Sequence, residues 1–248
     1  MTILQDTIPA RSSAKSREWK AVLILILLIP VLWSPPFLFR YFLYHNIPSN
    51  SMVPTLMVGD YVFAAKYAYG YGRYSFPFAP SWTSGRVLAA EPEYGDIVVF
   101  RTPKDTSVDY VKRVIGLPGD RIQMRQGQLI PNDRPVTRVA LKGAPADSTC
   151  GVNEGAEVRR WRETLPNGAS YVTHDCDDNS VYDNTKIFTV PPDHFFVLGD
   201  NRDNSSDSRS AATIGFVPMD NLVGKVTRIF WSLDEDGEPR FERLGKVE

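Results

Sequence analysis

The 248-residue sequence has little of several features that would classify a protein at once. It contains only two cysteines and three histidines, and its 28 basic and 29 acidic residues leave a net charge of −1. This balance gives no reason to propose a nucleic-acid partner, because such proteins usually carry a basic surface. No internal repeat or low-complexity tract occurs, and the 43% hydrophobic and 23% charged residues are typical of a globular protein.

Long apolar runs are also scarce, and only one has spanning length. Residues 21–39 contain no charged side chain, and a helix of that length crosses roughly the thickness of the bilayer's hydrocarbon core. Apolarity on all sides argues against a buried core helix, and no small-x-small site follows the run, as a cleavable signal would need. We therefore expect a retained transmembrane anchor at 21–39.

The flanks of this run predict its orientation. Four basic residues precede the run, whereas only Arg40 closely follows it. The positive-inside rule then places the tail 1–20 in the cytoplasm and residues 40–248 on the outer side, which in a bacterium is the periplasm. We expect a single-pass protein of the inner membrane, in contact with the lipid bilayer.

Helical periodicity is hard to find after residue 45, and short runs rich in β-branched and aromatic residues take its place. Turn signals rich in proline, glycine, asparagine and aspartate separate many of these runs. The pattern predicts a mainly β fold, in which the N-terminal helix is followed by an antiparallel β-rich domain. The expected strands are residues 60–67, 96–101, 109–116, 120–125, 186–190, 194–199 and 224–231.

A more polar segment interrupts this pattern at about 126–185. We expect it to be an insertion that caps a core built from about 45–125 and 186–232, with a solvated C-terminal tail. The segment contains Cys150 and Cys176, which lie in the exported part, where a disulfide can persist. The sequence leaves open whether these two cysteines pair.

Residues 67–82 form a second exception, because seven of the sixteen residues are aromatic. The overall aromatic content of 12% would give about two. Two interpretations stay open. The segment is a loop folded onto the core, or it dips into the outer leaflet of the membrane, where tyrosine and tryptophan are favoured.

Nucleophilic chemistry has no histidine-based signature here, because no G-x-S-x-G motif accompanies any histidine. A serine can instead be activated by a neutral lysine, whose pKa must fall from about 10.4 to roughly 7–8 through apolar burial. Lys112 lies in an expected strand and shares a face with Tyr110 and Val114. On periodicity alone, a lysine that reaches out to solvent is the more ordinary interpretation.

A loop dense in polar side chains, "GDNRDNSSDSR", occupies residues 199–209. Its spacing lacks the glycine and glutamate that a calcium-binding loop requires. The loop is either a solvated turn or a hydrogen-bonded network that orients catalytic groups. In the second case Ser205 would orient a lysine amine and Asp207 would pair with Arg209.

Four blocks together resemble the type I signal peptidases, membrane-anchored serine endopeptidases that remove export signals. In family order they are "PSNSMVPTL" (48–56), "GDYVF" (59–63), "YVKRVIGLPGD" (110–120) and "GDNRDNSSDSR" (199–209). Two departures from the family pattern are present. Asn50 stands where many members have glycine, and the chain has one apolar run where some members have two.

The resemblance implies a Ser-Lys dyad that needs no metal and no organic cofactor. It makes Ser51 the nucleophile, Lys112 the general base and Ser49 a side-chain donor to the oxyanion. The residues that would support the dyad and its loop are Ser205, Asp207 and Arg209. The residues that would shape the substrate cleft are Ile47, Met52, Leu56, Tyr110 and Val111.

The implied substrates are exported preproteins with small residues before the cut, in an A-x-A pattern. One alternative is a pilin-processing peptidase of conjugative transfer that uses the same dyad. A second is a non-catalytic, anchored β-domain that binds a periplasmic partner. A self-cleaving Ser-Lys repressor would need a DNA-binding region where this chain has its apolar run.

Overall fold

The chain divides into two units, Met1–Tyr41 and Phe42–Glu248. The computed structural model describes most of the second unit and little of the first. The described residues are 22–24, 26–28, 42–75, 85–145, 150, 157–177 and 179–247. Both pieces described in the first unit are helical, and the rest of the expected anchor lies outside the described residues. Among the residues described, no helix has the length and apolarity needed to cross a membrane.

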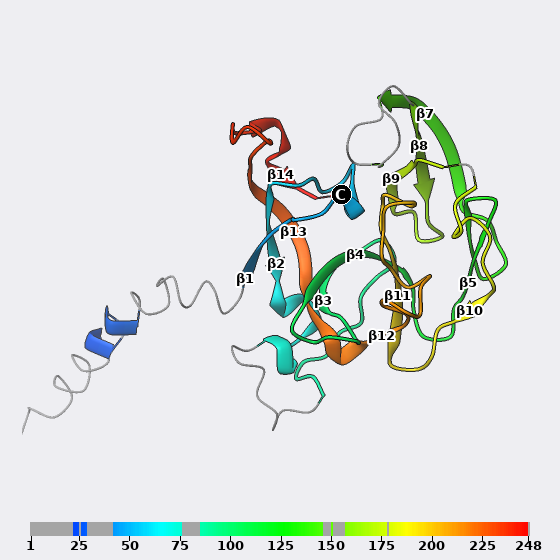
Figure 1. The fold of residues 1–248 in the computed structure, drawn as a ribbon. Coiled ribbons are helices and arrows are strands. Elements are labelled where there is room, and N and C mark those ends of the chain that lie inside the picture. Colours follow the sequence, from blue (N-terminus) through cyan, green and yellow to red (C-terminus); the bar gives the residue numbers. More distant parts are fainter. Residues whose placement is uncertain are drawn as a thin grey trace, which may run out of the picture. The chain divides into compact units, whose positions relative to one another are not determined.

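The second unit is built of β-strands joined by turns and short 3₁₀-helices (Figure 1). Its strands are β1 (Phe42–Asn46), β2 (Asp60–Ala65), β3 (Ile97–Arg101), β4 (Asp109–Gly116), β5 (Arg121–Arg125), β6 (Gln128–Pro131), β7 (Thr137–Pro145), β8 (Glu157–Thr164), β9 (Ser170–Asp175), β10 (Phe188–Thr189), β11 (His194–Leu198), β12 (Val217–Pro218), β13 (Leu222–Ser232) and β14 (Gly245–Lys246). The 3₁₀-helices are η1 (Asn50–Met52), η2 (Lys66–Tyr69), η3 (Arg73–Ser75), η4 (Met219–Asn221) and η5 (Phe241–Arg243).

The strands form one large sheet and two small ones. The large sheet has eight strands in the order β1-β2-β13-β3-β4-β11-β12, with β14 paired to β13. The small sheets are β10-β5-β6 and β7-β8-β9, and all the strand pairs are antiparallel. The prediction of a mainly β, antiparallel fold is confirmed. Each of the seven expected strands is present, with ends that agree to within two residues.

The large sheet is buried on both faces, as the alternation along β3 shows. Ile97 and Val99 belong to one cluster of buried side chains, whereas Val98 and Phe100 belong to another. Successive side chains of a strand point to opposite faces, so the two clusters lie on opposite sides of the sheet. This explains why β3 reads as a continuous apolar run and not as an alternating one.

The expected boundary between core and insertion, at about residue 125, falls inside a β-hairpin. Strand β5 pairs with β6 as well as with β10. Strands β5 and β6 are joined by Gln126 and Gly127, whose φ angles are 48° and 70°. Two positive φ angles are typical of the type I′ turn, which matches the right-handed twist of the paired strands. The strands β7, β8 and β9 pair neither with the large sheet nor with β10-β5-β6, and we call them the cap sheet.

The C-terminal tail is also less solvated than expected. Strand β14 pairs with β13, and Arg240 and Arg243 both reach Asp60, whose side chain is completely buried. The charged sequence of the tail suggested a solvated segment, because a local pattern does not show that two arginines share one buried acid.

The aromatic segment 67–82 is described only as far as Ser75. Within that part Tyr69 is buried in a core cluster and donates a hydrogen bond to Asp96 at 2.7 Å, which fits a loop folded onto the core. The portion for which membrane contact was considered continues into residues 76–82, which lie outside the described residues.

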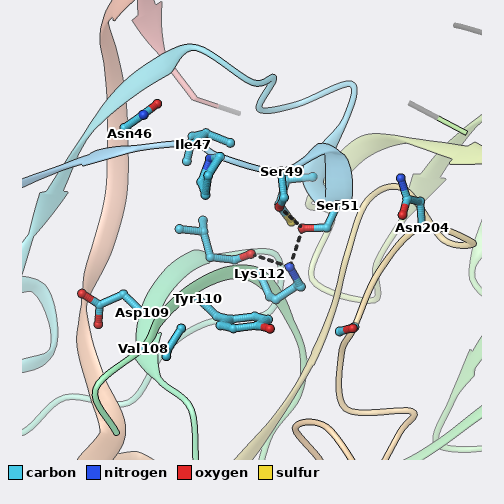
Figure 2. A pocket seen from close by; sticks show the side chains of 13 residues that line it. Asn46, Ile47, Ser49, Ser51, Val108, Asp109, Tyr110, Lys112 and Asn204 are labelled. Carbon is cyan, nitrogen blue, oxygen red and sulfur yellow. Dashed lines mark hydrogen bonds between the residues drawn. The ribbon is translucent and has the colours of Figure 1, made fainter. Parts of the chain in front are cut away.

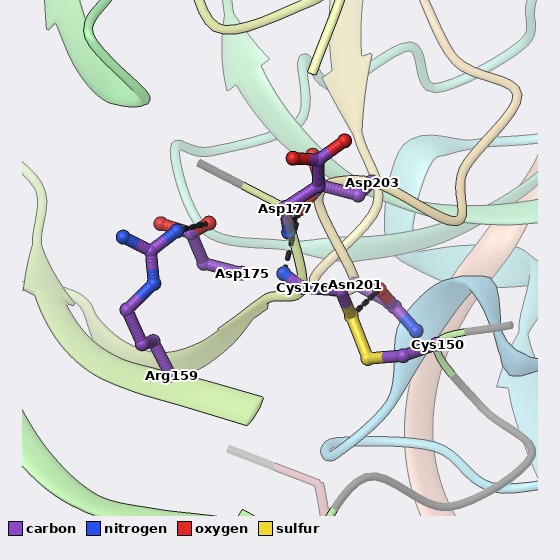
Figure 3. Close-up of a disulfide and its surroundings, with 7 residues drawn as sticks. All are labelled: Cys150, Arg159, Asp175, Cys176, Asp177, Asn201 and Asp203. Atoms are coloured by element: carbon purple, nitrogen blue, oxygen red, sulfur yellow. Dashed lines mark hydrogen bonds and ion pairs between the residues drawn. A yellow bond between two sulfur atoms is a disulfide. The ribbon is translucent and has the colours of Figure 1, made fainter. Parts of the chain in front are cut away.

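A disulfide joins Cys150 to Cys176, which directly follows β9 (Figure 3). The Cys176 N–H donates to the Asp203 carboxylate at 2.6 Å, and the Cys176 sulfur lies 3.6 Å from Oδ1 of Asn201. The question that the sequence left open is therefore answered, since the cysteines pair. The bond lies against the loop 199–209, far from both cysteines in the sequence.

A buried ion pair attaches the cap sheet to the same loop. Glu163 of β8 has no exposed surface, and its two carboxylate oxygens accept hydrogen bonds from Arg202 at 3.1 and 2.5 Å. Arg202 is itself only 4% exposed. Two buried charges of this kind are tolerated together, whereas either one alone is costly.

Replacing Glu163 with alanine leaves the charge of Arg202 buried without this partner. We expect the free energy of unfolding to fall by about 3–5 kcal/mol, measured on the purified chain by denaturant unfolding and circular dichroism. The matched control is Arg121→Ala, which breaks an exposed pair with Asp133 and should cost less than about 1 kcal/mol. Equal losses of unfolding free energy in the two variants would contradict the expected contribution of the buried pair.

Candidate active site

The turn before β2 carries two serines close together. Ser49 is extended, with φ −139° and ψ 156°, and the 3₁₀-helix η1 that follows contains Ser51. The two hydroxyl oxygens lie 3.2 Å apart. Met52 is 1% exposed and fixes the turn in the core. Asn50 begins η1 without a positive φ, so the turn does not require glycine at that position.

Strand β4 brings Lys112 against this turn. Its Nζ lies 2.5 Å from Oγ of Ser51 and donates to the Val111 carbonyl at 3.0 Å (Figure 2). The Tyr110 ring, on the same face of the strand, lies 5.3 Å from the amine. Lys112 is only 2% exposed, so the interpretation of a lysine that reaches out to solvent is wrong.

Burial also changes the ionisation of this amine. Removal from water lowers the pKa of Lys112 to about 8, while the negative charges of Asp207 and Asp200 act in the opposite direction. A buried amine without a directly paired carboxylate favours its neutral form. The arrangement therefore places a proton acceptor, with a pKa close to neutrality, in contact with a serine hydroxyl.

The loop 199–209 closes the site from the other side. Asp207 accepts hydrogen bonds from Arg209 at 2.9 Å and from the Gly199 N–H at 3.1 Å, so the pairing suggested by the sequence is present. Burial opposes ionisation of Asp207, but Arg209 and these backbone groups outweigh it and hold the pKa of the carboxyl below its usual value. The loop thus carries a fixed negative charge that is already matched by an arginine.

Gly199 allows this loop to approach the turn that carries Ser49 and Ser51. A Cβ added to it would lie 2.5 Å from the Ser51 carbonyl oxygen and 2.2 Å from the Ser205 hydroxyl, so a side chain does not fit. The Asn201 N–H donates to the same Ser51 carbonyl at 3.2 Å. The Ser205 hydroxyl is buried and has no hydrogen-bond partner among the described residues, so its predicted bond to Lys112 is not formed in this structure.

Three further residues connect the parts of the site, and sequence reasoning assigned them no role. Arg113 binds Asp200 with two hydrogen bonds of 2.8 and 2.7 Å, and Asp200 also accepts from the Thr55 hydroxyl at 2.5 Å. All three lie inside blocks quoted above. The available signal was therefore the presence of opposite charges in two separate blocks.

A cavity of about 390 Å³ opens beside Ser51 and Lys112. The extended segments 46–49 and 108–112 line it, and Figure 2 shows Asn46 and Asp109 at the end away from the dyad. Of the residues predicted to shape the cleft, those that line the cavity are Ile47, Met52, Tyr110 and Val111. Leu56 does not line it, because its side chain is completely buried in the core cluster that contains Met52.

One edge of β4 is free beside this cavity. Residues 109–113 pair with β3, whereas β11 pairs only with residues from Arg113 to Gly116. Along residues 109–112 the second edge therefore has no partner strand in the described part of the chain. The same part contains no cluster of three or more histidine, cysteine, aspartate or glutamate side chains that could hold a metal ion.

Comparison with known proteins places the chain among its relatives. The family model described as "Signal peptidase, peptidase S26" matches residues 16–231. A signal peptidase I from Rickettsia canadensis is 40% identical over 241 residues, which cover 92% of this chain and 84% of that protein. A second, from Rickettsia conorii, is 41% identical over 228 residues, with 87% and 79% covered. A crystal structure of a signal peptidase I from Enterococcus faecalis is 27% identical, covers 56% of this chain and 98% of that chain, and has a TM-score of 0.33. The chain thus belongs to the signal peptidase family, peptidase S26.

Proposed function

We propose that this protein is a membrane-anchored serine endopeptidase that removes signal peptides from exported preproteins, with Ser51 as nucleophile and Lys112 as general base. One observation carries the assignment of residues. The amine of Lys112 is buried, has a pKa lowered to about 8 and lies 2.5 Å from the Ser51 hydroxyl. Membership of the signal peptidase family supports the activity and the class of substrate.

The reaction is an acyl transfer. Neutral Lys112 accepts the Ser51 proton, and the Ser51 oxygen attacks the scissile carbonyl carbon. The Ser51 N–H and the Ser49 hydroxyl stabilise the oxyanion that forms. The protonated lysine then gives its proton to the leaving amine, and a water activated by Lys112 hydrolyses the ester on Ser51.

The lowered pKa decides how much of the enzyme can start this reaction. At pH 7 an amine with a pKa of about 8 is neutral in roughly a tenth of the molecules. An amine with the ordinary value of 10.5 would be neutral in about one molecule in 3,000. Burial therefore raises the reactive fraction by about 300-fold at that pH.

The free edge of β4 suits an extended substrate. A peptide can add as a strand along residues 109–112, with its backbone held by hydrogen bonds and its side chains directed alternately to either side. The residues first and third before the cut then point the same way, into the part of the cavity near Ile47 and Tyr110. The two alanines of an A-x-A site would both lie on this side of the peptide.

The position of Ser51 in the chain fits a membrane substrate. It lies twelve residues beyond Phe39, the end of the apolar run that we take as the anchor, with residues 1–20 in the cytoplasm and 40–248 outside. A signal peptide likewise has its apolar part in the bilayer and its cut site a few residues beyond. The disulfide of Cys150 and Cys176 supports an exported location, in a bacterium the outer side of the inner membrane.

The first test of this proposal replaces the dyad. Ser51→Ala and Lys112→Ala should each lower cleavage of a preprotein with an A-x-A site by at least about 1,000-fold, because each removes a group that the first step requires. Cleavage is measured by gel shift of the purified preprotein. Circular dichroism verifies folding, and Lys112→Met replaces the alanine variant if the cavity left by alanine disrupts the core.

Lys104→Ala, which removes an exposed lysine, is the control and should cleave at the normal rate. Undiminished cleavage by Ser51→Ala would reject the nucleophile. A folded wild-type protein that cleaves no preprotein would instead favour the non-catalytic β-domain.

A second test uses pH. Since the neutral amine is the active form, protonation removes activity, so kcat/KM should rise about tenfold per pH unit and level off near the Lys112 pKa of about 8. Asp207→Asn removes a charge that raises this pKa, and should therefore move the rising limb to lower pH. The profile is measured with an uncharged peptide substrate. A limb near 10.5, or a limb unmoved in Asp207→Asn, would count against Lys112 as the base.

A further inference from the structure

We propose that Arg243, in the C-terminal tail, is a positioning residue for the reaction. It clamps the segment Thr55–Asp60, which begins four residues after Ser51, and thereby holds Ser51 at its distance from Lys112. This inference rests on the proposed function of the dyad, although the residues that carry it are different ones.

The clamp begins at a buried carboxylate. Asp60 has no exposed surface, and Arg243 donates to it from Nε at 2.8 Å and from a terminal nitrogen at 2.5 Å. The Ser232 hydroxyl donates to the same group at 2.7 Å, and a nitrogen of Arg240 lies 3.6 Å away. A buried carboxylate is costly unless it is paired and hydrogen-bonded, so these interactions stabilise the tail in its position against Asp60.

The tail also binds backbone groups of the segment Thr55–Asp60. Arg243 also donates to the Thr55 carbonyl at 3.1 Å, and Arg240 donates to the Val58 carbonyl at 2.6 Å. The Leu233 N–H donates to the Gly59 carbonyl at 3.0 Å. Gly59 has φ +85°, and a Cβ there would lie 2.1 Å from the Leu233 carbonyl oxygen, so tail and turn approach as closely as backbones can.

Thr55 is held from the opposite side as well. Its hydroxyl donates to Asp200, and Asp200 is bound by Arg113, the neighbour of Lys112 in β4. The segment that carries Ser51 is therefore linked through Thr55 to the strand that carries Lys112. The carbonyl of Thr55 is anchored by Arg243, and the next amide, that of Leu56, donates to the Met52 carbonyl at 2.9 Å.

Loss of Arg243 should loosen this segment without opening the core. Arg243 lies at the rim of the fold, with its side chain 16% exposed, and Asp60 keeps Ser232 and Arg240 as partners when it is removed. The dyad contact of 2.5 Å is sensitive to small shifts, since a displacement of about 1 Å can cost roughly a hundredfold in rate.

The test compares Arg243→Ala with Arg228→Ala, which removes an exposed arginine from β13. In Arg243→Ala we expect kcat to fall about 10- to 100-fold and KM to stay within about twofold, because the substrate cleft is unchanged. Arg243→Lys should recover only part of kcat, since one ammonium cannot hold Asp60 and Thr55 with the fixed fork of a guanidinium. Added guanidinium ion, at tens of millimolar, should partly restore kcat in Arg243→Ala and not in Arg228→Ala.

A double-mutant cycle tests the route through Thr55. Thr55→Val removes the hydroxyl that binds Asp200, and if both contacts position one segment, the kcat losses of the two changes should combine to less than their product. Independent, multiplicative losses would overturn the proposal. So would a folded Arg243→Ala whose kcat stays within about twofold of the wild type. If Arg243→Ala does not fold, the same cycle is measured with Arg243→Lys and Thr55→Val.

Hydrogen exchange gives a readout that needs no activity. Backbone amides of residues 51–60 should exchange faster in Arg243→Ala than in wild type or Arg228→Ala, while those of β3 and β4 stay protected. Unchanged exchange in 51–60 would overturn the clamp even if the dyad is correct. Conversely, failure of Ser51→Ala to stop cleavage would reject the dyad and leave the exchange result standing.

Discussion

The structure depends on burying one lysine amine beside a serine, which lowers the pKa of that amine to about 8. Two carboxylates, Asp200 and Asp207, lie close enough to favour the charged form of Lys112. Each of them is already bound by an arginine, Arg113 in one case and Arg209 in the other. Because a guanidinium keeps its charge at any ordinary pH, it neutralises most of the field that these acids would exert on the lysine. Burial can then dominate, and the pKa falls.

The cap sheet contributes to this balance of buried charges. The loop 199–209 contains a third arginine, Arg202, which is buried next to the same network. Its charge would be unmatched without Glu163, which comes from β8 in the middle of the polar insertion. One physical role of the insertion is therefore to supply the acid that balances the loop. Cys176, at the end of β9, links the cap to the same loop a second time, because its N–H donates to the Asp203 carboxylate.

The limits of prediction from sequence follow from this use of buried charge. Five strands of the large sheet were predictable, namely β2, β3, β4, β11 and β13, since apolar side chains fill both faces of that sheet. The cap strands were not, because β8 has a buried glutamate at Glu163 between Arg162 and Thr164, and buries its polar groups as ion pairs. A period-two pattern of hydrophobicity is lost when charges occupy both faces of a strand. Leu56 was misplaced because a motif shows proximity in the chain and not the direction of a side chain.

The contacts that would hold the segment after Ser51 join residues far apart in the sequence. Thr55 meets Asp200 across 145 positions and Arg243 across 188 positions. Neither contact leaves a local pattern, yet together they hold the segment that follows Ser51. A short turn at the start of the domain has few partners of its own, so its rigidity must come from elements formed later in the chain. In the proposed mechanism Ser51 is therefore held in place only when the sheet, the loop 199–209 and the tail have all assembled, so cleavage should require the complete domain.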